Sequence, residues 1–90
     1  MSDNLPNQQC LQHACKIAIN EDKPILLDYW SDENNILIGV RDSGEKLLVK
    51  SEDEYTSPIS KIFKVVDSYI IMTENSIYIT SASIPSKKIS

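Results

Sequence analysis

The segment Ile59–Ile84, ISKIFKVVDSYIIMTENSIYITSASI, decides the fold of this chain. It is the longest apolar-rich stretch of the sequence, and its enrichment in Ile, Val, Thr and Tyr is typical of strands rather than helices. Turns are expected at Asp67–Ser68 and at Glu74–Ser76, because Asn tolerates a positive φ at little cost. The segment therefore predicts three consecutive strands, at Ile59–Val66, Tyr69–Thr73 and Ile77–Ala82.

The hairpin within this segment carries apolar side chains on both of its faces. Successive residues of a strand point to opposite faces, so Tyr69 and Ile71 lie opposite Ile70 and Met72. A sheet with one solvated face carries polar residues on that face, whereas this hairpin is apolar on both faces. The predicted helix covers only one of them. The apolar side chains that the helix leaves uncovered predict either a closed barrel or a second subunit. Our candidate protein interface consists of Tyr69, Ile70, Met72, Tyr78 and Trp30.

The first part of the chain predicts a helix that ends by Asn20. Asn4 is a plausible N-cap, Pro6 is tolerated in the first turn, and Pro24 prevents the helix from continuing. Apolar residues recur at spacings of three and four, which gives one broad apolar stripe. The stripe comprises Cys10, Leu11, Ala14, Cys15, Ile17 and Ala18.

Between the helix and the C-terminal segment we expect three further strands: Ile25–Ser31, Ile36–Arg41 and Lys46–Lys50. The last two form a hairpin across Asp42–Glu45, in which Gly44 supplies the positive φ. An acidic loop follows over residues 51–58. Pro85 is expected to end strand pairing, and residues 1–4 and 86–90 are expected to be flexible tails.

These elements predict an α+β fold in a single domain over residues 1–90. It consists of an N-terminal helix followed by five or six antiparallel strands that form a curled sheet or small β-barrel.

Composition narrows the class of function. The net charge is −4, and no half of the chain is dominated by basic residues, which argues against nonspecific binding to duplex nucleic acid. The sequence contains neither an apolar run that is long enough to span a bilayer nor a signal peptide, so we expect a cytoplasmic protein without membrane association. Cys10 and Cys15 are too far apart on a helix for a disulfide.

Candidate chemistry is sparse. His13 is the only histidine, and Cys10, His13 and Cys15 do not present one face of a helix to a metal ion. The sequence has no recognisable nucleophile motif and no Gly-rich phosphate loop. We therefore expect no cofactor, no metal and no enzymatic activity.

The stretch Asp22–Trp30, DKPILLDYW, resembles the central strand of thioredoxin-like proteins. In that family a Cys-x-x-Cys motif follows within a few residues at the start of a helix. Here Ser31–Ile36 follows, without a cysteine, so the resemblance implies no redox function and we assign no family.

Two sets of surface residues are candidates for recognition. Added phosphate at Ser51, Thr56 or Ser57 in the acidic loop would suit an Arg-bearing partner, although a solvated loop is the simpler interpretation. A basic patch would contact RNA or single-stranded DNA if its strands are neighbours. The alternative is that these lysines protect a sheet edge from pairing. The candidate patch consists of Arg41, Lys46, Lys50, Lys61 and Lys64.

The leading hypothesis is a small non-catalytic protein-interaction module that self-associates, or docks on another protein, through its β-sheet. A small-barrel RNA or single-stranded DNA-binding protein is the second hypothesis. A third is a viral or phage accessory protein that binds a host factor; its only support is small size and a composition rich in Ile, Lys and Asn.

Overall fold

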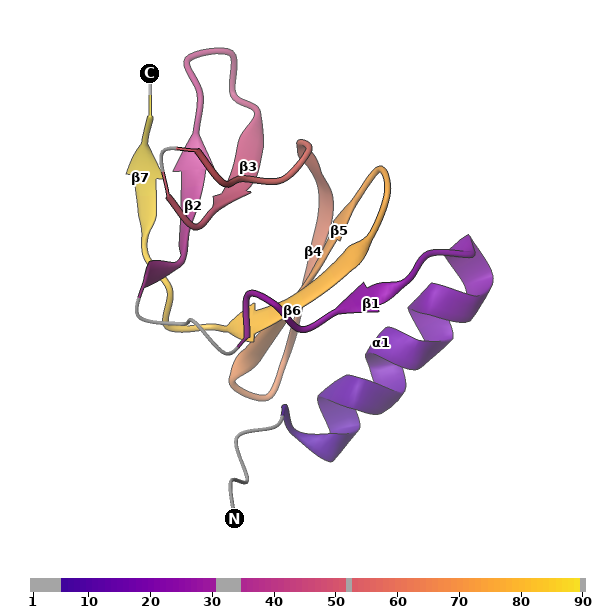
Figure 1. Ribbon diagram of the computed structural model, residues 1–90. Coiled ribbons are helices and arrows are strands. Elements are labelled where there is room, and N and C mark those ends of the chain that lie inside the picture. The colour runs from indigo at the N-terminus through magenta and orange to yellow at the C-terminus, as the bar shows by residue number, and fades with distance from the viewer. Residues whose placement is uncertain (1–5, 31–34, 52, 90) are drawn as a thin grey trace.

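The computed structural model describes residues 6–30, 35–51 and 53–89. It contains one helix and seven strands in two mixed sheets, arranged as three layers (Figure 1). The predicted α+β class is confirmed, but the predicted five or six antiparallel strands and the closed barrel are wrong. The elements are α1 (Gln8–Glu21), β1 (Ile25–Leu26), β2 (Leu37–Val40), β3 (Lys46–Val49), β4 (Ile59–Val65), β5 (Ser68–Thr73), β6 (Ile77–Ser81) and β7 (Ser86–Lys88).

Helix α1 starts later than the sequence predicts. The N-cap is Asn7, whose side chain accepts a hydrogen bond of 2.7 Å from the backbone N–H of Gln9, while Asn4 lies outside the described residues. The helix ends at Glu21, and its C-cap, Asp22, adopts a left-handed conformation with φ 57°. The next residue, Lys23, donates from Nζ to the carbonyl of Thr73 at 2.8 Å and so ties the end of the helix to the first sheet.

The first sheet has the strand order β1-β6-β5-β4. The three predicted strands of the C-terminal segment form its antiparallel part, while β1 pairs in parallel with β6. The β5–β6 turn lies at the expected residues. The β4–β5 turn does not, because Val66 and Asp67 form it and Ser68 already belongs to β5.

The predicted strand Ile25–Ser31 is mostly wrong, because of its described residues, 25–30, only Ile25 and Leu26 pair with a neighbour; Ser31 lies outside the described residues. The chain then turns, and the N–H of Trp30 donates to the carbonyl of Leu27 at 3.1 Å. The turn sends Tyr29 into the space between the two sheets, where its side chain is buried. Burial of this ring outweighs the strand preference of the sequence.

The second sheet has the order β3-β2-β7 and contains the predicted hairpin, with Gly44 at φ 95° in its turn. The expected flexible tail is also wrong in part, since Ser86–Lys88 forms β7 in parallel with β2. Pro85 does not prevent this pairing. A proline lacks only the N–H donor, and its carbonyl accepts a hydrogen bond of 2.8 Å from the N–H of Ile38.

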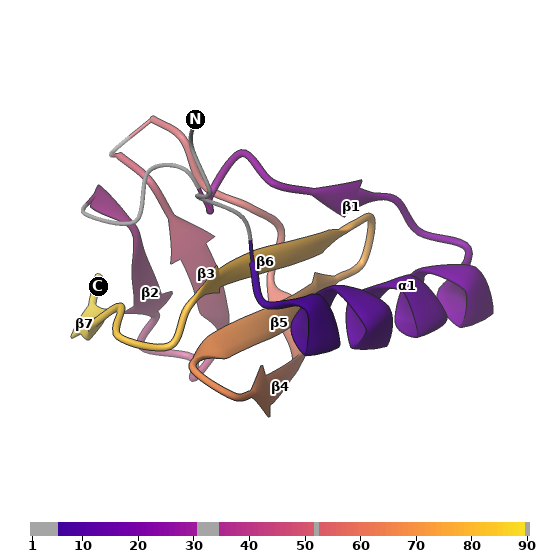
Figure 2. The same ribbon diagram turned by 90° about the horizontal axis from the view of Figure 1, so that it is seen from below.

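The two faces of the first sheet are covered by different layers (Figures 1 and 2). Cys10 and Ala14 of α1 pack with residues of β5 and β6 on one face. On the other face, Ile36, Ile38 and Leu48 of the second sheet and its flank pack with Ile71. Apolar residues on both faces of β5 are therefore covered within the single chain, which removes the reason for predicting a barrel or a second subunit from that pattern.

Replacement of Gly39 by alanine should loosen β7. A Cβ atom at this position would lie 2.7 Å from Cδ1 of Ile89 and 3.0 Å from Cγ2 of Val49, closer than such atoms pack. We expect Gly39→Ala to lower the free energy of unfolding by about 1–3 kcal/mol in chemical denaturation. The cost should be smaller in an Ile89→Ala background, which removes the clash. A Gly39→Ala variant as stable as the parent would contradict this packing.

Tyr29 predicts a loss of stability at alkaline pH. Burial, followed by the nearby Tyr78, Glu54 and Asp28, raises the pKa of its phenol to about 12. In the unfolded chain the phenol ionises near pH 10, so between about pH 10 and about pH 12 only the unfolded state releases this proton. The stabilisation that the protonated Tyr29 phenol contributes to the folded state is therefore complete below pH 10. It is lost as the pH rises through 12.

This prediction is tested by urea denaturation near pH 9 and near pH 11. The Tyr29→Phe variant keeps the ring that packs edge-on against Tyr78, with 5.2 Å between centroids. The parent should lose more stability between the two pH values than Tyr29→Phe does. Burial also raises the pKa of Cys10, but this thiol is present in both proteins, so its effect on stability cancels in the comparison. Equal losses would rule out the role given to Tyr29.

Candidate functional site

The residues of the predicted interface lie in the interior or at its border. Ile70 is fully buried and Met72 is nearly so, both on the side covered by α1, where the half-buried Trp30 also packs. Tyr69 and Tyr78 are half-buried against the core between the sheets. The side chains that the sequence singled out for docking therefore pack within or against the two core clusters of the chain.

Three of the six large apolar side chains that are exposed in the described residues lie on or directly after β4, and the other three, Ile19, Leu27 and Tyr55, lie elsewhere in the chain. Strand β4 is the edge of the first sheet and pairs only with β5 among the described strands. Ile62 and Phe63 at its centre are each 37% exposed, and Val66 beyond its end is 56% exposed. Five of the seven residues of β4 are solvent-exposed, whereas five of the six residues of β5, all but Tyr69, are buried.

The register of the β4–β5 pair assigns each side chain of β4 to a face. Lys61 and Phe63 are opposite Met72 and Ile70, so they share the face that α1 covers. Ile62 is opposite Ile71 and shares the face of the second sheet. A bulge between Ile59 and Lys61 interrupts the ladder near the start of the strand. The edge that we name the β4 edge consists of Lys61–Val65 and the adjoining Val66.

Val66 is held in a conformation that a β-branched residue rarely adopts. Its φ is 59°, in the left-handed region, and the side chain points into solvent rather than into a core. This conformation costs an L-residue roughly 1–2 kcal/mol. Neither packing nor backbone preference accounts for a valine at this position.

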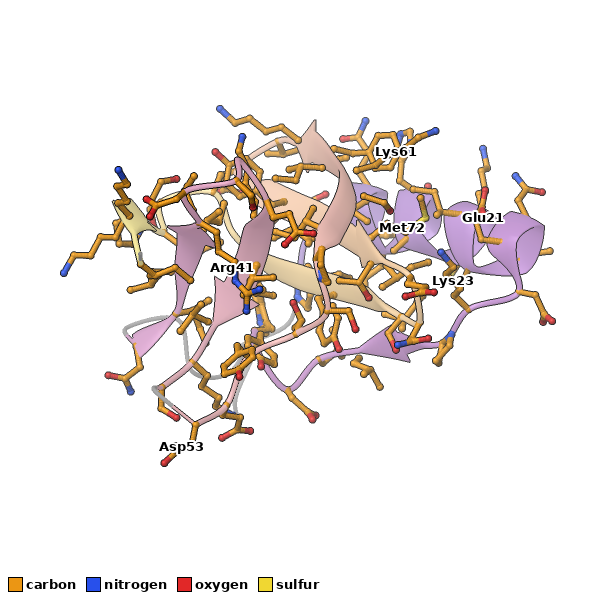
Figure 3. The ribbon with its side chains drawn as sticks, turned by 90° about the horizontal axis from the view of Figure 1, so that it is seen from above. Glu21, Lys23, Arg41, Asp53, Lys61 and Met72 are labelled. Atoms are coloured by element: carbon orange, nitrogen blue, oxygen red, sulfur yellow. The ribbon has the colours of Figure 1, made fainter. Side chains whose placement is uncertain are left out.

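The five basic residues of the candidate nucleic-acid patch do not form one stripe. Arg41, Lys46 and Lys50 belong to the second sheet or its flanks, and Lys61 and Lys64 lie on β4 of the first sheet. Figure 3 shows Arg41 and Lys61 in separate parts of the molecule, with Lys61 near Met72 on the side of α1. Lys61 and Lys64 also face opposite sides of β4, because they pair with Met72 and Tyr69.

The three candidate phosphorylation residues differ in accessibility. Thr56 is only 8% exposed, and its hydroxyl accepts from the N–H of Leu48 at 3.1 Å and donates to the carbonyl of Ser57 at 2.8 Å. Ser57 is half-buried and accepts from Asn75. Ser51 is exposed. The hydroxyl of Thr56 is used within the fold, so Ser51 is the accessible member of the set.

A second surface feature is a hollow of about 610 Å³ on the second sheet. Ile38 and Leu48 face the first sheet, so their neighbours Leu37, Leu47 and Val49 point to the opposite side, where they form the floor of the hollow. Ile89 and Tyr55 contribute further apolar surface, and Arg41 and Lys50 contribute positive charge. The remaining lining residues are Asn35 and Ser51. Sequence patterns missed this hollow because it depends on β7, which was expected to be a tail.

Side chains that bind metal ions do not converge in the part of the chain that the structure describes. Within those ranges, no three His, Cys, Asp or Glu side chains lie close enough to hold a metal ion. Cys10 is buried between α1 and the first sheet, where burial raises the pKa of its thiol, while Cys15 and His13 are exposed. The described helix is too short to cross a bilayer.

A Val66→Asn substitution should raise the free energy of unfolding by about 1 kcal/mol, because asparagine tolerates the left-handed conformation that valine resists. Ile19→Asn is the matched control: Ile19 is 80% exposed but lies in regular helix, so the same loss of exposed apolar surface relieves no backbone strain there. Both variants are compared by thermal and urea denaturation. A Val66→Asn protein no more stable than the parent would show that the turn is unstrained.

The comparisons with known proteins add no identification. No protein-family model matches the chain, and neither a curated protein nor a solved structure is found to be similar to it.

Proposed function

We propose that this chain is a small non-catalytic protein-interaction module that self-associates through the β4 edge. The observation that carries the proposal is the exposure of Ile62 and Phe63 on an edge strand of seven residues, whereas five of the six residues of the neighbouring β5 are buried. An edge strand offers both main-chain hydrogen bonds and side-chain contacts to an added strand, which is the mode of β-strand addition.

The backbone of β4 has pairing capacity to spare. In an antiparallel ladder, alternate residues direct both their N–H and their C=O toward the same neighbour, so the groups of the remaining residues point away from it. Because β5 is the only described strand that pairs with β4, those groups lie on the open side of the sheet. A second strand on that side would form hydrogen bonds with these N–H and C=O groups. Because β4 is already ordered, such pairing would cost little conformational entropy.

Two-fold symmetry allows β4 to pair with β4 of a second copy without opposing its lysines. When such a pair extends one sheet, directly opposite side chains share a face, so each residue faces one that is an even number of positions away. Lys61 and Lys64 are separated by an odd number of positions and lie on opposite faces. The symmetric pair therefore never places Lys61 of one copy directly opposite Lys64 of the other.

The two central registers also bring apolar groups together. With Phe63 on the axis, the two Phe63 rings meet, Lys61 faces Val65, and Lys64 faces Ile62. With Ile62 on the axis, Ile62 meets its own copy and Lys61 faces Phe63. Opposing apolar pairs of this kind contribute roughly 0.2–1 kcal/mol each.

The edge lysines have a second consequence, which concerns specificity. Lysines on an edge strand oppose indiscriminate pairing, because most registers with an arbitrary strand bury or confront a charge. The bulge near Ile59 further restricts regular pairing to the later part of β4. Together they favour one symmetric partner over random aggregation.

The alternatives from the sequence remain predictions with less support. Binding of RNA or single-stranded DNA by the basic patch requires neighbouring lysines, but the patch is divided between two sheets. The role as a viral or phage accessory protein gains no observation from the fold.

Sedimentation velocity over a wide range of concentrations tests the proposal. The parent should pass from monomer to dimer as concentration rises. Ile62→Lys should shift the transition to at least tenfold higher concentration, because it places a charge at the centre of the paired strands.

Ile19→Lys is the control, since it introduces the same charge at an exposed apolar position on α1, away from the β4 edge. It should dimerise like the parent. Circular dichroism and thermal melting verify that each variant is folded. A parent that stays monomeric up to millimolar concentration, or an Ile62→Lys protein that dimerises normally, would refute self-association through this edge.

A further inference from the structure

We propose that the hollow on the second sheet binds a small amphipathic carboxylate, with its apolar body on the floor and its carboxylate at Arg41. This inference is independent of self-association, because the hollow lies on the second sheet and the β4 edge belongs to the first.

The hollow is a built concavity rather than a flat patch. Its volume of about 610 Å³ lies within the range of small-molecule sites, roughly 300–1,000 Å³. Its wall is fixed by backbone pairing on both sides. Ile89 is held by a hydrogen bond of 2.9 Å from its N–H to the carbonyl of Val40, and Tyr55 is held by an isolated bridge to Val49.

The absence of a side chain at Gly39 shapes the floor. Ile89 and Val49 approach the position that a Cβ atom of residue 39 would occupy, so they close over the middle of β2. The half-buried Leu37 presents apolar surface beside Gly39, whereas Leu47 on the neighbouring strand supports the floor and is itself only 2% exposed. An apolar chain or ring placed there replaces water over a continuous hydrophobic floor, which favours binding in proportion to the area covered.

The charge at the rim selects the sign of the ligand. Arg41 and Lys50 line the hollow, and no Asp or Glu is among its described lining residues. The guanidinium of Arg41 lies 3.7 Å from Glu45, and the two side chains are 45% and 50% exposed. That separation exceeds a good hydrogen bond and both groups are solvated, so the pair contributes little and leaves Arg41 able to bind another carboxylate.

Arg41 is better placed for this role than Lys50. The Nζ of Lys50 lies 5.4 Å from the centroid of the Tyr29 ring and 3.9 Å from Glu54, and its side chain is 23% exposed. It therefore contributes positive potential beside the hollow, whereas the planar guanidinium of Arg41 can present two parallel N–H groups to a carboxylate.

The test is a titration of the ¹⁵N-labelled protein with sodium decanoate below its micelle-forming concentration, followed by amide chemical shifts. Decanol, which has the same chain without the charge, and decyltrimethylammonium, which has the opposite charge, are run in parallel. We expect saturable shifts at Leu37, Val49, Tyr55 and Ile89, with decanoate binding about tenfold more tightly than decanol, as a charge-assisted hydrogen bond implies.

Arg41→Gln should remove most of the preference for decanoate over decanol. Lys46→Gln is the matched control, because Lys46 is an exposed cation on the same sheet that does not line the hollow. It should leave the preference unchanged. The proposal is overturned if decanoate causes no saturable shifts, if it binds no better than decanol, if Arg41→Gln keeps the full preference, or if the shifts fall on Ile62 and Phe63.

Discussion

The structure depends on the burial of β5 on both of its faces. Ile70 and Ile71 are adjacent in sequence, point in opposite directions and are each fully buried. Complete burial of such a side chain is worth roughly 1.5–3 kcal/mol, so exposure of either face would cost a domain of this size a large part of its stability. The chain must therefore supply a cover for each side of the first sheet. Helix α1 is one cover and the second sheet is the other.

The first and the last strand, β1 and β7, are short and help to position these two covers. β1 and β7 have few residues and no sequence periodicity of their own, yet each adds a parallel strand where a layer has to be positioned. The N–H of Ile77 donates to the carbonyl of Pro24 at 2.8 Å, and the N–H of Ile38 donates to the carbonyl of Pro85. In both places a proline serves as an acceptor only. The β4 edge is the part of the first sheet that this arrangement leaves uncovered.

Sequence periodicity predicted the elements in which buried residues recur at a regular spacing. The helix, the β2–β3 hairpin and the three strands of the C-terminal segment follow from apolar spacing, and Gly44 indicates its turn through backbone preference. The order of the strands could not be predicted from the sequence. The apolar residues on both faces of β5 show that each face is covered, but they do not show which part of the chain covers it. For the same reason the sequence could not show that α1 covers Ile70 and Met72, two residues of the predicted interface. Exposed edge residues such as Ile62 carry no distinct sequence signal, because buried and edge strands use the same residue types.

The surfaces that the fold leaves exposed are therefore the candidates for function. The β4 edge and the hollow of the second sheet differ in chemistry. The β4 edge offers backbone pairing between lysines, and the hollow offers an apolar floor beside Arg41. Hydrogen–deuterium exchange at low and at high protein concentration tests the central claim most directly. The account predicts that amide protection in Lys61–Val65 rises with concentration while β5 stays protected throughout. Exchange in β4 that is rapid at every concentration, or new protection confined to the second sheet, would contradict it.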